Sequence, residues 1–316
     1  METPLFSLPL ARYRYEWIVQ SELRLPDYAG SALRGVFGGW LRQLACMARQ
    51  PECGGCTLVS TCPYATIFET PVPKRAVGEK GLGVIPNPYV IEPPAWGRRV
   101  YAPGETLIFH QVLVGRALER LPLVILAWQR AMAHGVGPGN GTAHLHRVVL
   151  EEGTEEREIY SSASGVICDH ATEVTVPPWE GGHRIILDLM TPTRIQKDGS
   201  PLGPGRLQPR DLLVSLMRRV SQIALLHCGR SWSLDHAELA ATASQFKGYG
   251  NLSWRDWTRR SSRQRQNMAL GGVVGRWTLE GDHHAFWPFV YLGSWLHVGK
   301  NATFGLGGYR LEGESP

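Results

Sequence analysis

The stretch RYRYEWIVQ (residues 12–20) alternates large apolar side chains with charged ones. The apolar positions are Tyr13, Tyr15, Trp17 and Val19, and the charged positions between them are Arg12, Arg14 and Glu16. Because successive side chains of a β-strand point to opposite faces, a period of two places every apolar side chain on the same side. The stretch therefore predicts a strand with one buried face and one polar face.

A helix and further strands are expected downstream of this strand. Residues 30–48 carry apolar side chains at helical spacing, whereas residues 51–104 are rich in proline and glycine, which indicates an irregular excursion with short strands. The next expected elements are a strand, a helix and a strand, at residues 106–115, 119–135 and 144–152. The first half of the chain is thus predicted to run strand, helix, strands, helix, strand.

A similar order recurs in the second half, after the proline and glycine residues at 177–182. The elements expected there are a strand, a helix, a strand, a helix and a strand, at residues 183–190, 208–227, 268–281, 283–299 and 303–312. The similar order in the two halves predicts an α+β protein with two tandem ferredoxin-like (RRM-like) domains of the β-α-β-β-α-β type, residues 1–178 and 179–316, although one strand of the second unit is not located by the sequence. A cysteine-rich insertion after the first helix completes the predicted architecture.

The composition is that of a globular protein. Of its 316 residues, 43% are hydrophobic and 19% are charged. No basic-plus-apolar leader opens the sequence, and the longest uninterrupted apolar run, residues 121–128, is too short to cross a bilayer. We therefore expect a cytoplasmic protein without a membrane partner.

The net charge of +5 is unevenly distributed along the chain. Residues 179–316 hold 17 lysines and arginines against 11 acidic residues, whereas residues 1–178 hold 16 against 17. The whole basic excess thus lies in the second half, where a polyanion would gain free energy from the release of counterions. This distribution favours a nucleic-acid partner for the second half.

Four cysteines of the first half lie close together in the segment LACMARQPECGGCTLVSTCPY (residues 44–64). They are Cys46, Cys53, Cys56 and Cys62, with the spacing C-x6-C-x2-C-x5-C. A turn such as CGGC presents two thiolates to one ion, and the flanking pair completes a tetrahedron, so the pattern predicts a structural zinc ion. An iron–sulfur cluster uses the same ligands and is the alternative. Incidental small apolar cysteines and disulfides are the other interpretations, although a cytoplasmic location disfavours disulfides.

A basic and aromatic stretch spans residues 246–277. Its cations are Lys247, Arg255, Arg259, Arg260, Arg263 and Arg265, with Tyr249, Trp254 and Trp257 among them. Arginine binds phosphate in a bidentate manner, and aromatic rings supply the platforms on which the bases of single-stranded nucleic acid stack. The stretch therefore predicts an RNA-binding surface. A solvated charged face, with its tryptophans in the core, is the alternative.

Near the end of the chain, HVGKNATFGLGGYRLE (residues 297–312) combines a histidine, a lysine and several glycines. Gly299, Gly305, Gly307 and Gly308 tolerate positive φ and let a backbone approach a ligand closely, and phosphate is the ligand that most often binds such amides. The run lacks the order of a nucleoside-triphosphate loop, because Lys300 precedes most of the glycines. It predicts contact with a phosphate polymer, and a flexible turn before a C-terminal strand is the alternative.

Several of these motifs together resemble a known family. They are WRDWTRRSSRQ (254–264), MALGGVVG (268–275), the terminal HVGK with FGLGGY, LMTPTRIQKDG (189–199) and the helix LRGVFGGWLRQLAC with its cysteines. The sequence is similar to the CRISPR-associated endoribonucleases of the RAMP superfamily, which process precursor CRISPR RNA. The resemblance is strongest over residues 183–312.

The resemblance implies tandem ferredoxin-like domains, recognition of the CRISPR repeat RNA, and a cut that needs no catalytic metal and leaves a 2′,3′-cyclic phosphate. It also implies that the glycine-rich loop, including Asn301, contacts the RNA backbone. Many members place a catalytic histidine on or beside the first helix of the N-terminal domain. Residues 1–109 of this chain contain no histidine, so the chain departs from the family there.

The reaction implied by the resemblance is attack of a ribose 2′-hydroxyl on the adjacent phosphate, which requires a base, an acid and a cation. Histidine is the side chain suited to proton transfer near neutral pH, and His297 lies three residues before Lys300. We predict His297 as base or acid and Lys300 as the cation, with Arg34 and Tyr28 as weaker candidates. Contact with RNA or a purely structural role is the alternative for His297.

A non-catalytic RNA-binding subunit of the same superfamily, docked to other CRISPR-associated proteins, is the competing function. A metal-dependent nuclease is disfavoured, because no acidic cluster with ligand spacing is visible in the sequence.

Overall fold

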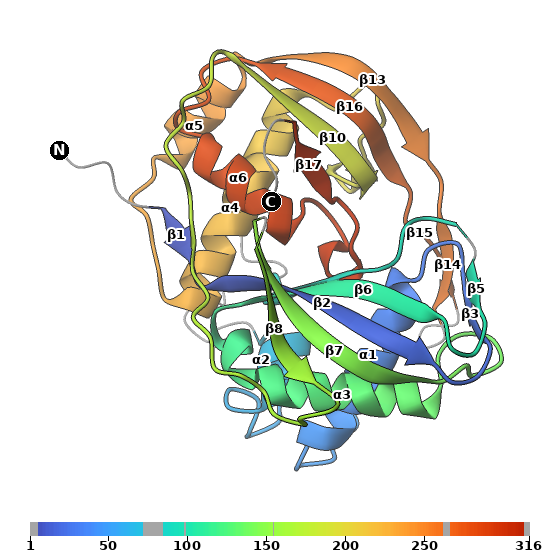
Figure 1. Cartoon of the computed structure of the whole chain (residues 1–316). Helices are drawn as coiled ribbons and strands as arrows, with labels where there is room; N and C mark the ends of the chain where they lie inside the picture. Colours follow the sequence, from blue (N-terminus) through green and yellow to red (C-terminus); the bar gives the residue numbers. More distant parts are fainter. Residues whose placement is uncertain (1–5, 72–84, 98, 154, 262–265, 313–316) are drawn as a thin grey trace. The chain divides into compact units, whose positions relative to one another are not determined.

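A computed structural model describes residues 6–71, 85–97, 99–153, 155–261 and 266–312, with the side chains of residues 259–269 outside the description (Figure 1). The chain forms two compact units. The N-terminal unit comprises residues 9–173 and 226–228, and the C-terminal unit comprises the residues before Pro9, residues 174–225 and those after Cys228. No helix among the described residues is long and apolar enough to cross a membrane.

The division at Glu173 lies close to the domain boundary predicted at residue 178. The sequence did not predict that the first strand of the chain belongs to the C-terminal unit. Strand β1 (Ser7–Leu8) pairs antiparallel with β9 (Val174–Thr175), directly after the division. The sequence signal for β1 is weak, since two residues are too short to display a period.

The N-terminal unit contains a five-stranded antiparallel sheet with the order β4-β6-β2-β7-β8. The strands are β2 (Leu10–Val19), β4 (Tyr89–Glu92), β6 (Thr106–Val114), β7 (Ala143–Glu152) and β8 (Glu155–Ser161). With α1 (Gly30–Ala45) after β2 and α3 (Leu121–His134) after β6, the chain runs β-α-β-β-α-β and ends beside its first strand. This is the order predicted for the first half.

The core of this unit lies between the sheet and the two helices. Trp17 and Phe109 are fully buried on the sheet, with ring centroids 6.0 Å apart. Phe37 of α1 stacks on Trp128 of α3 at 4.8 Å, and the indole Nε1 of Trp128 donates a 2.7 Å hydrogen bond to Oε1 of Gln111. The alternation read from residues 12–20 is confirmed, because the apolar positions of β2 are the ones that this core buries.

Shorter elements complete the N-terminal unit. They are β3 (Leu23–Leu25) paired with β5 (Arg99–Tyr101), α2 (Pro63–Phe68) and the 3₁₀ helix η2 (Gly115–Arg120). The cysteine-rich residues between α1 and α2 form turns without a strand or helix of their own. Their interpretation as an insertion stays a prediction.

The C-terminal unit contains a four-stranded antiparallel sheet with the order β13-β16-β10-β17. The strands are β10 (Arg184–Thr193), β13 (Lys247–Arg255), β16 (Gly272–Glu280) and β17 (Tyr309–Leu311). Helix α4 (Pro209–Cys228) follows β10 and α6 (Trp287–Leu296) follows β16, so this unit has the same β-α-β-β-α-β order. The predicted α+β class is confirmed.

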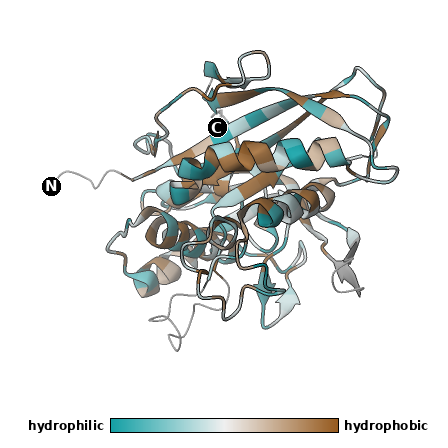
Figure 2. Cartoon of the chain, turned by 90° about the horizontal axis from the view of Figure 1, so that it is seen from below, coloured by the Kyte–Doolittle hydropathy of each residue, from teal (hydrophilic) through white to brown (hydrophobic). Residues whose placement is uncertain are grey.

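Local sequence determines the two long helices of this unit. Helix α4 begins at a capping box of Gln208 and Asp211 and ends at Gly229, whose φ of 65° is left-handed. Helix α6 is apolar nearly all round because it packs on several sides, and at Gly293 an added Cβ would lie 2.4 Å from both Leu216 and the Tyr309 hydroxyl. In Figure 2 the helices show hydrophobic and hydrophilic patches along their length.

The remaining elements are minor. They are β11 (Gln196–Lys197) with β12 (Ser200–Pro201), α5 (His236–Ala243), β14 (Thr258–Ser261) with β15 (Gln266–Ala269), and the 3₁₀ helix η3 (Ala302–Phe304). The single strand expected at residues 268–281 is in fact two, because β15 and β16 belong to different sheets. The strand expected at residues 303–312 is reduced to β17, because Gly305 and Gly307 have left-handed φ angles that a strand does not accommodate.

Candidate functional site

Three segments that the sequence analysis singled out meet in the C-terminal unit. They are the end of β10 with residue 194, the MALGG segment before and at the start of β16, and the loop of residues 297–308 that we call the glycine loop. The amide of Lys300 donates to the carbonyl of Arg194 at 2.9 Å, and Nη1 of Arg194 donates to the carbonyl of Gly271 at 2.8 Å. At the other end of the loop, Gly308 donates its amide to Oγ1 of Thr191 at 2.8 Å. Residues far apart in sequence are thus joined by hydrogen bonds, each with at least one backbone partner.

Glycines make this junction possible because the backbones touch. A Cβ on Gly307 would lie 1.8 Å from the carbonyl oxygen of Val298, and a Cβ on Gly299 would lie 2.5 Å from that of Arg194. A Cβ on Gly272 would lie 2.7 Å from the carbonyl carbon of Thr193. No larger residue fits at these distances.

The expectation that the glycine amides of the loop are open to phosphate is wrong for three of the glycines. The amides of Gly305, Gly307 and Gly308 donate to Ala302, Pro192 and Thr191, respectively, and Lys300 donates its own to Arg194. A phosphate therefore cannot use these amides while the loop has this conformation. RNA contact by the loop stays a prediction. In this conformation the contact would be made by side chains and by the outer part of the loop.

His297 ends helix α6 and lies inside the unit. Its side chain and backbone are 5% exposed, and its Nδ1 lies 3.2 Å from the carbonyl oxygen of Leu306, to which it donates. The ring lies against Gly308, where a Cβ would be 2.8 Å from its Cε1. The backbone has φ 58° and ψ 174°, a region that is inexpensive only for glycine. A histidine thus stands at a position where glycine would be less strained, and its ring hydrogen-bonds to the loop through the Leu306 carbonyl.

Two basic side chains and one amide side chain lie on the outer part of this junction. Lys300 is exposed, and Asn301 beside it is half-buried with a left-handed φ of 64°. Arg194 is half-buried and held by Gly271. Arg194 was not predicted as a site residue. Its place in the LMTPTRIQKDG motif is the signal from which it could have been found.

The basic stretch of residues 246–277 is only partly described. Lys247 and Arg255 are exposed at the two ends of β13. Arg259 and Arg260 lie on β14, but their side chains are outside the description, and Arg263 and Arg265 lie outside the described residues altogether. Their predicted contact with RNA stays a prediction.

Tyr28 and Arg34 belong to the N-terminal unit and are engaged in its packing. Tyr28 is 2% exposed, its ring lies 4.8 Å from that of Trp96, and burial raises the pKa of its hydroxyl well above the ordinary value. Arg34 donates from Nε to the hydroxyl of Tyr89 at 2.8 Å, with its guanidinium 4.1 Å above the Phe68 ring. These contacts favour structural roles for both, and a catalytic role stays a prediction.

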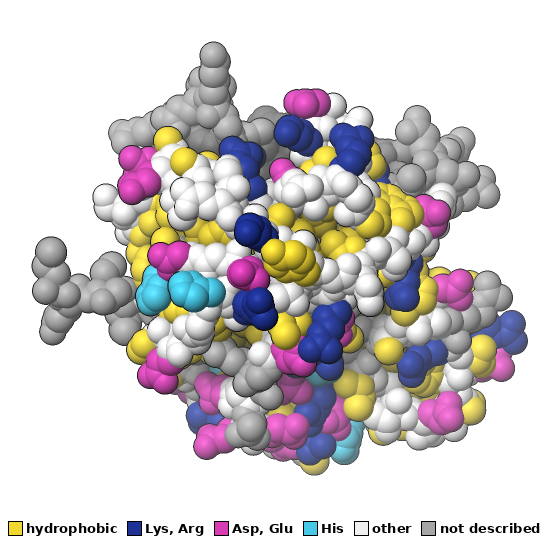
Figure 3. All heavy atoms as spheres, turned by 90° about the horizontal axis from the view of Figure 1, so that it is seen from above, with side chains coloured by type: hydrophobic (Ala, Val, Ile, Leu, Met, Phe, Trp, Pro, Cys, Tyr) yellow, Lys and Arg dark blue, Asp and Glu magenta, His cyan; other side chains and the backbone are white. Residues whose placement is uncertain are grey.

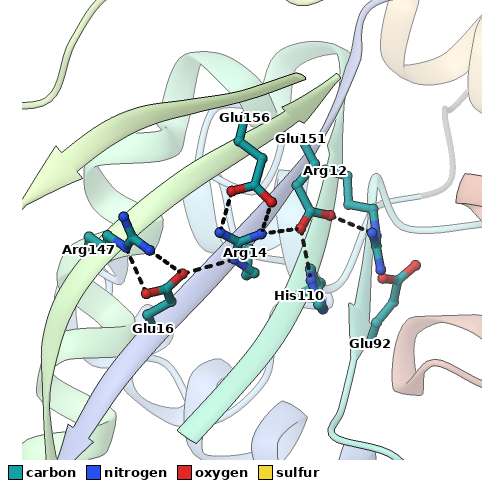
Figure 4. A network of polar contacts seen from close by, with 8 residues as sticks. All are labelled: Arg12, Arg14, Glu16, Glu92, His110, Arg147, Glu151 and Glu156. Atoms are coloured by element: carbon teal, nitrogen blue, oxygen red, sulfur yellow. Dashed lines mark hydrogen bonds and ion pairs between the residues drawn. The ribbon is translucent and has the colours of Figure 1, made fainter. Parts of the chain in front are cut away.

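The polar face of the N-terminal sheet carries a connected network of ion pairs (Figure 4). Its members are Arg12, Arg14, Glu16, Glu92, His110, Arg147, Glu151 and Glu156. Burial alone would raise the pKa of Glu16, but hydrogen bonds from Arg147 at 2.7 Å and Arg14 at 3.0 Å outweigh it and lower that pKa. With four glutamates facing three arginines, this surface offers no excess positive charge to a polyanion.

The four cysteines line one pocket between the end of α1 and the start of α2. Sγ of Cys62, directly before α2, lies 4.0 Å from the carbonyl oxygen of Ala45, the last residue of α1. In the described part of the chain, however, no three histidine, cysteine or acidic side chains are placed as a metal ligand set. The residues at the pocket have the chemistry for zinc or an iron–sulfur cluster, and metal binding stays a prediction.

Comparison with known proteins gives matches over both halves. Residues 8–172, more than half of the chain, match the AF_1859_N family, described as an N-terminal domain. Residues 187–309 match the family of the CRISPR-associated endoribonuclease Cas6. No curated protein matches the sequence.

Solved structures share the fold. A Cas6 product complex matches with a TM-score of 0.58 at 16% identity, over 96% of this chain and 98% of that one. Thermus thermophilus Cas6 matches with a TM-score of 0.53 at 16% identity, over 96% and 98%. The partial Cas6-RT-Cas1–Cas2 complex matches with a TM-score of 0.55 at 14% identity, over 99% of this chain and 47% of that one. At these identities the likeness establishes a common fold.

The ion-pair network predicts a pH dependence of stability. The folded pKa of Glu16 lies below its ordinary value of 4.5, so the network stabilises the N-terminal unit above that pH and loses this contribution as the pH falls towards the folded pKa. In Glu16→Gln, the free energy of unfolding should vary less steeply below about pH 5 than in the wild type. Urea unfolding at a series of pH values measures the slopes. Glu119→Gln, which alters an exposed carboxylate outside the network, is the control, and an unchanged slope in Glu16→Gln would contradict the prediction.

Gly307→Ala should destabilise the C-terminal unit. The added methyl group would meet the Val298 carbonyl oxygen, and the residue would be held at a φ of 71°, so a loss of about 3 kcal/mol or more in the free energy of unfolding is expected. Gly205→Ala is the control, because a Cβ there meets no atom within 4 Å. Thermal melts of both variants test this expectation, and equal melting temperatures would show that the loop is not held by this contact.

Proposed function

We propose that the protein binds CRISPR repeat RNA and cleaves precursor crRNA, because residues 187–309 match the family of the CRISPR-associated endoribonuclease Cas6. We take its two units as tandem ferredoxin-like domains of the kind found in this superfamily. The match of the first half to a family of N-terminal domains supports a protein built from both units.

The observation that carries this proposal is the junction of three recognised segments in the C-terminal unit. A backbone hydrogen bond from Lys300 holds the glycine loop on Arg194 at the end of β10, the Arg194 side chain donates to Gly271, and the outer side of this junction presents Lys300 and Arg194. A lysine next to a backbone held by several hydrogen bonds is a suitable contact for a phosphate, because the cation needs little reorganisation to stabilise developing charge. The site thus combines rigidity with positive charge.

We propose that the 2′-hydroxyl of the RNA attacks the adjacent phosphorus, that the bond from phosphorus to the 5′-oxygen breaks, and that a 2′,3′-cyclic phosphate remains. The hydroxyl proton passes to a base, and the leaving oxygen takes a proton from an acid. No catalytic metal takes part in this scheme. Lys300 stabilises the charge on the phosphate oxygens.

His297 has two proposed roles that one pair of variants separates. Its ring holds Leu306 through Nδ1, which is a positioning role, and the same imidazole is the predicted group for proton transfer. An asparagine keeps an N–H donor for the Leu306 carbonyl, but it does not titrate. His297→Asn therefore preserves the positioning role alone.

A second candidate function is that of a non-catalytic RNA-binding subunit. The buried position of His297 favours it, because a group that transfers protons must reach the RNA. The likeness to the Cas6 part of a Cas6-RT-Cas1–Cas2 complex supports a role beside other Cas proteins in either case.

Incubation with repeat RNA in EDTA tests the function. We expect one cut with a 2′,3′-cyclic end, a loss of at least 100-fold in cleavage rate for Lys300→Ala, and a comparable loss for His297→Asn if the imidazole transfers a proton. His284→Ala is the control, because that side chain is 75% exposed. Tight binding without cleavage supports the non-catalytic subunit, full activity of His297→Asn limits His297 to positioning, and cleavage abolished by EDTA contradicts the metal-independent scheme.

We also propose that the cysteine pocket binds a structural zinc ion, with an iron–sulfur cluster as the alternative. Protein purified without chelators should contain about one zinc per chain by elemental analysis, since four thiolates form a closed tetrahedral site. Cys53→Ser with Cys56→Ser should abolish the metal and lower the melting temperature, whereas Cys168→Ser, at an exposed cysteine elsewhere, should change neither. Wild-type protein that contains no metal, and whose melting temperature equals that of the double serine variant, would contradict the site.

A further inference from the structure

The C-terminal sheet has one face that no helix of the described residues covers. Alternate residues of its strands point to the core, where Leu187 and Leu279 are fully buried. Most of the other set is exposed or half-buried, with Val274 buried at one end, on the face that we call the open face; helices α4 and α6 lie on the opposite side of the sheet (Figure 1). A sheet face left uncovered in this way is available to a partner.

The open face carries an exposed aromatic ring and an exposed methionine. Tyr249 on β13 is 51% exposed and lies opposite Thr278 of β16. Met190 at the end of β10 is 43% exposed. Two strand spacings, about 10 Å, separate the strands of Tyr249 and Met190. Exposed aromatic rings on a four-stranded sheet are the means by which RRM-type modules stack bases.

The same face carries an excess of positive charge. Five basic side chains, Lys247, Arg184, Arg255, Arg276 and Arg310, share it with three acidic ones, Asp188, Glu280 and Glu312. The ion pair between Arg184 and Glu280 at 3.0 Å and that between Arg276 and Glu312 are largely exposed, so they contribute little and can yield to phosphate. Figure 3 looks onto these strands and shows lysine and arginine among hydrophobic side chains.

Register places the charges close to the ring. Lys247 stands two residues before Tyr249 on the same strand, about 7 Å away. Arg276, Asp188 and Arg310 form a row across neighbouring strands, next to the row of Tyr249 and Thr278. A strand of RNA crossing the face would therefore meet a stacking ring and cations on both sides of it.

The N-terminal sheet provides an internal contrast. Its polar face has three arginines, all engaged with glutamates, and it has one more acidic than arginine side chain in the network of Figure 4. Its aromatic residues Tyr13, Tyr15 and Trp17 are fully buried on the other face. Of the two sheets, the C-terminal one has the charge and the exposed ring that single-stranded RNA requires.

We propose that the open face of the C-terminal sheet binds a single-stranded segment of the substrate RNA, with Tyr249 stacked on a base and Lys247 and Arg310 on phosphates. The inference deepens the proposed function, on which it rests for the identity of the RNA. The occupant is single-stranded because stacking needs a base free of its partner, and the recognition is tolerant of sequence because every base presents a flat face.

Binding of a fluorescent, unstructured oligoadenylate of about ten nucleotides tests this proposal. Tyr249→Ala should weaken binding about ten-fold or more, the order expected for the loss of one stacked base, and Tyr249→Phe should bind like the wild type. Lys247→Gln and Arg310→Gln should each lower the slope of log Kd against log salt by about 0.7, the value for one phosphate of a single strand. Tyr101→Ala, at a half-buried tyrosine of the N-terminal unit, is the matched control.

The outcomes separate this inference from the proposed function. Weaker oligoadenylate binding by Tyr249→Ala supports the open face even if the wild type cleaves no RNA, in which case the proposed function alone fails. Unchanged binding by Tyr249→Ala in a protein that cleaves repeat RNA overturns the inference and leaves the function. Equal affinity for a double-stranded RNA of the same length, with equal losses in all variants, also overturns it. Because Tyr249 is exposed, the variant's melting temperature should match the wild type and exclude misfolding.

Discussion

The contact between the backbones at Gly307 and Val298 is the constraint on which the C-terminal site depends. The amide of Val298 donates to the Gly307 carbonyl at 3.0 Å, while the Val298 carbonyl occupies the space where a side chain of residue 307 would stand. This contact turns the chain back after α6 and delivers it to β17, which pairs with β10. Lys300 lies within the segment that this contact closes, and its amide donates to the Arg194 carbonyl at 2.9 Å, which sets its position relative to Arg194.

Strain and hydrogen bonding are balanced within this loop. Five residues, His297, Gly299, Asn301, Gly305 and Gly307, have positive φ, and two of them are not glycine. Non-glycine residues in such conformations cost on the order of 1–3 kcal/mol and persist where the surroundings determine them. At His297 the ring's bond to Leu306 offsets part of that cost. A loop held in this way is rigid, which suits a site that stabilises charge without moving.

The two sheets illustrate how one topology serves different surfaces. Both units run β-α-β-β-α-β, and both bury one sheet face under helices. On the N-terminal sheet, glutamates neutralise arginines across neighbouring strands, which stabilises the face and removes its attraction for a polyanion. On the C-terminal sheet, the arginine pairs are exposed and an aromatic ring remains uncovered. The positive excess of the second half of the sequence therefore lies in part on a surface that an RNA strand can reach.

The sequence by itself determined the class of the fold and the order of its main elements, because the periods of two and of 3.6 are local properties that side-chain burial imposes on each segment. The strand of residues 12–20, the helix that became α4 and the recurrence of the same order in the second half were all readable. It also located the segments of the site, through the motifs around residues 194, 271 and 300.

Tertiary structure alone decided what those segments do. The glycine amides, which sequence reasoning offered to a phosphate, donate to Ala302, Pro192 and Thr191 instead, and the ring of His297 lies inside the loop. Arg194 joined the site through its contact with Gly271, 77 residues away in the chain. Hydrogen-bond partners at such separations are set by the packing of whole elements, and no local pattern of residues records which donor will meet which acceptor.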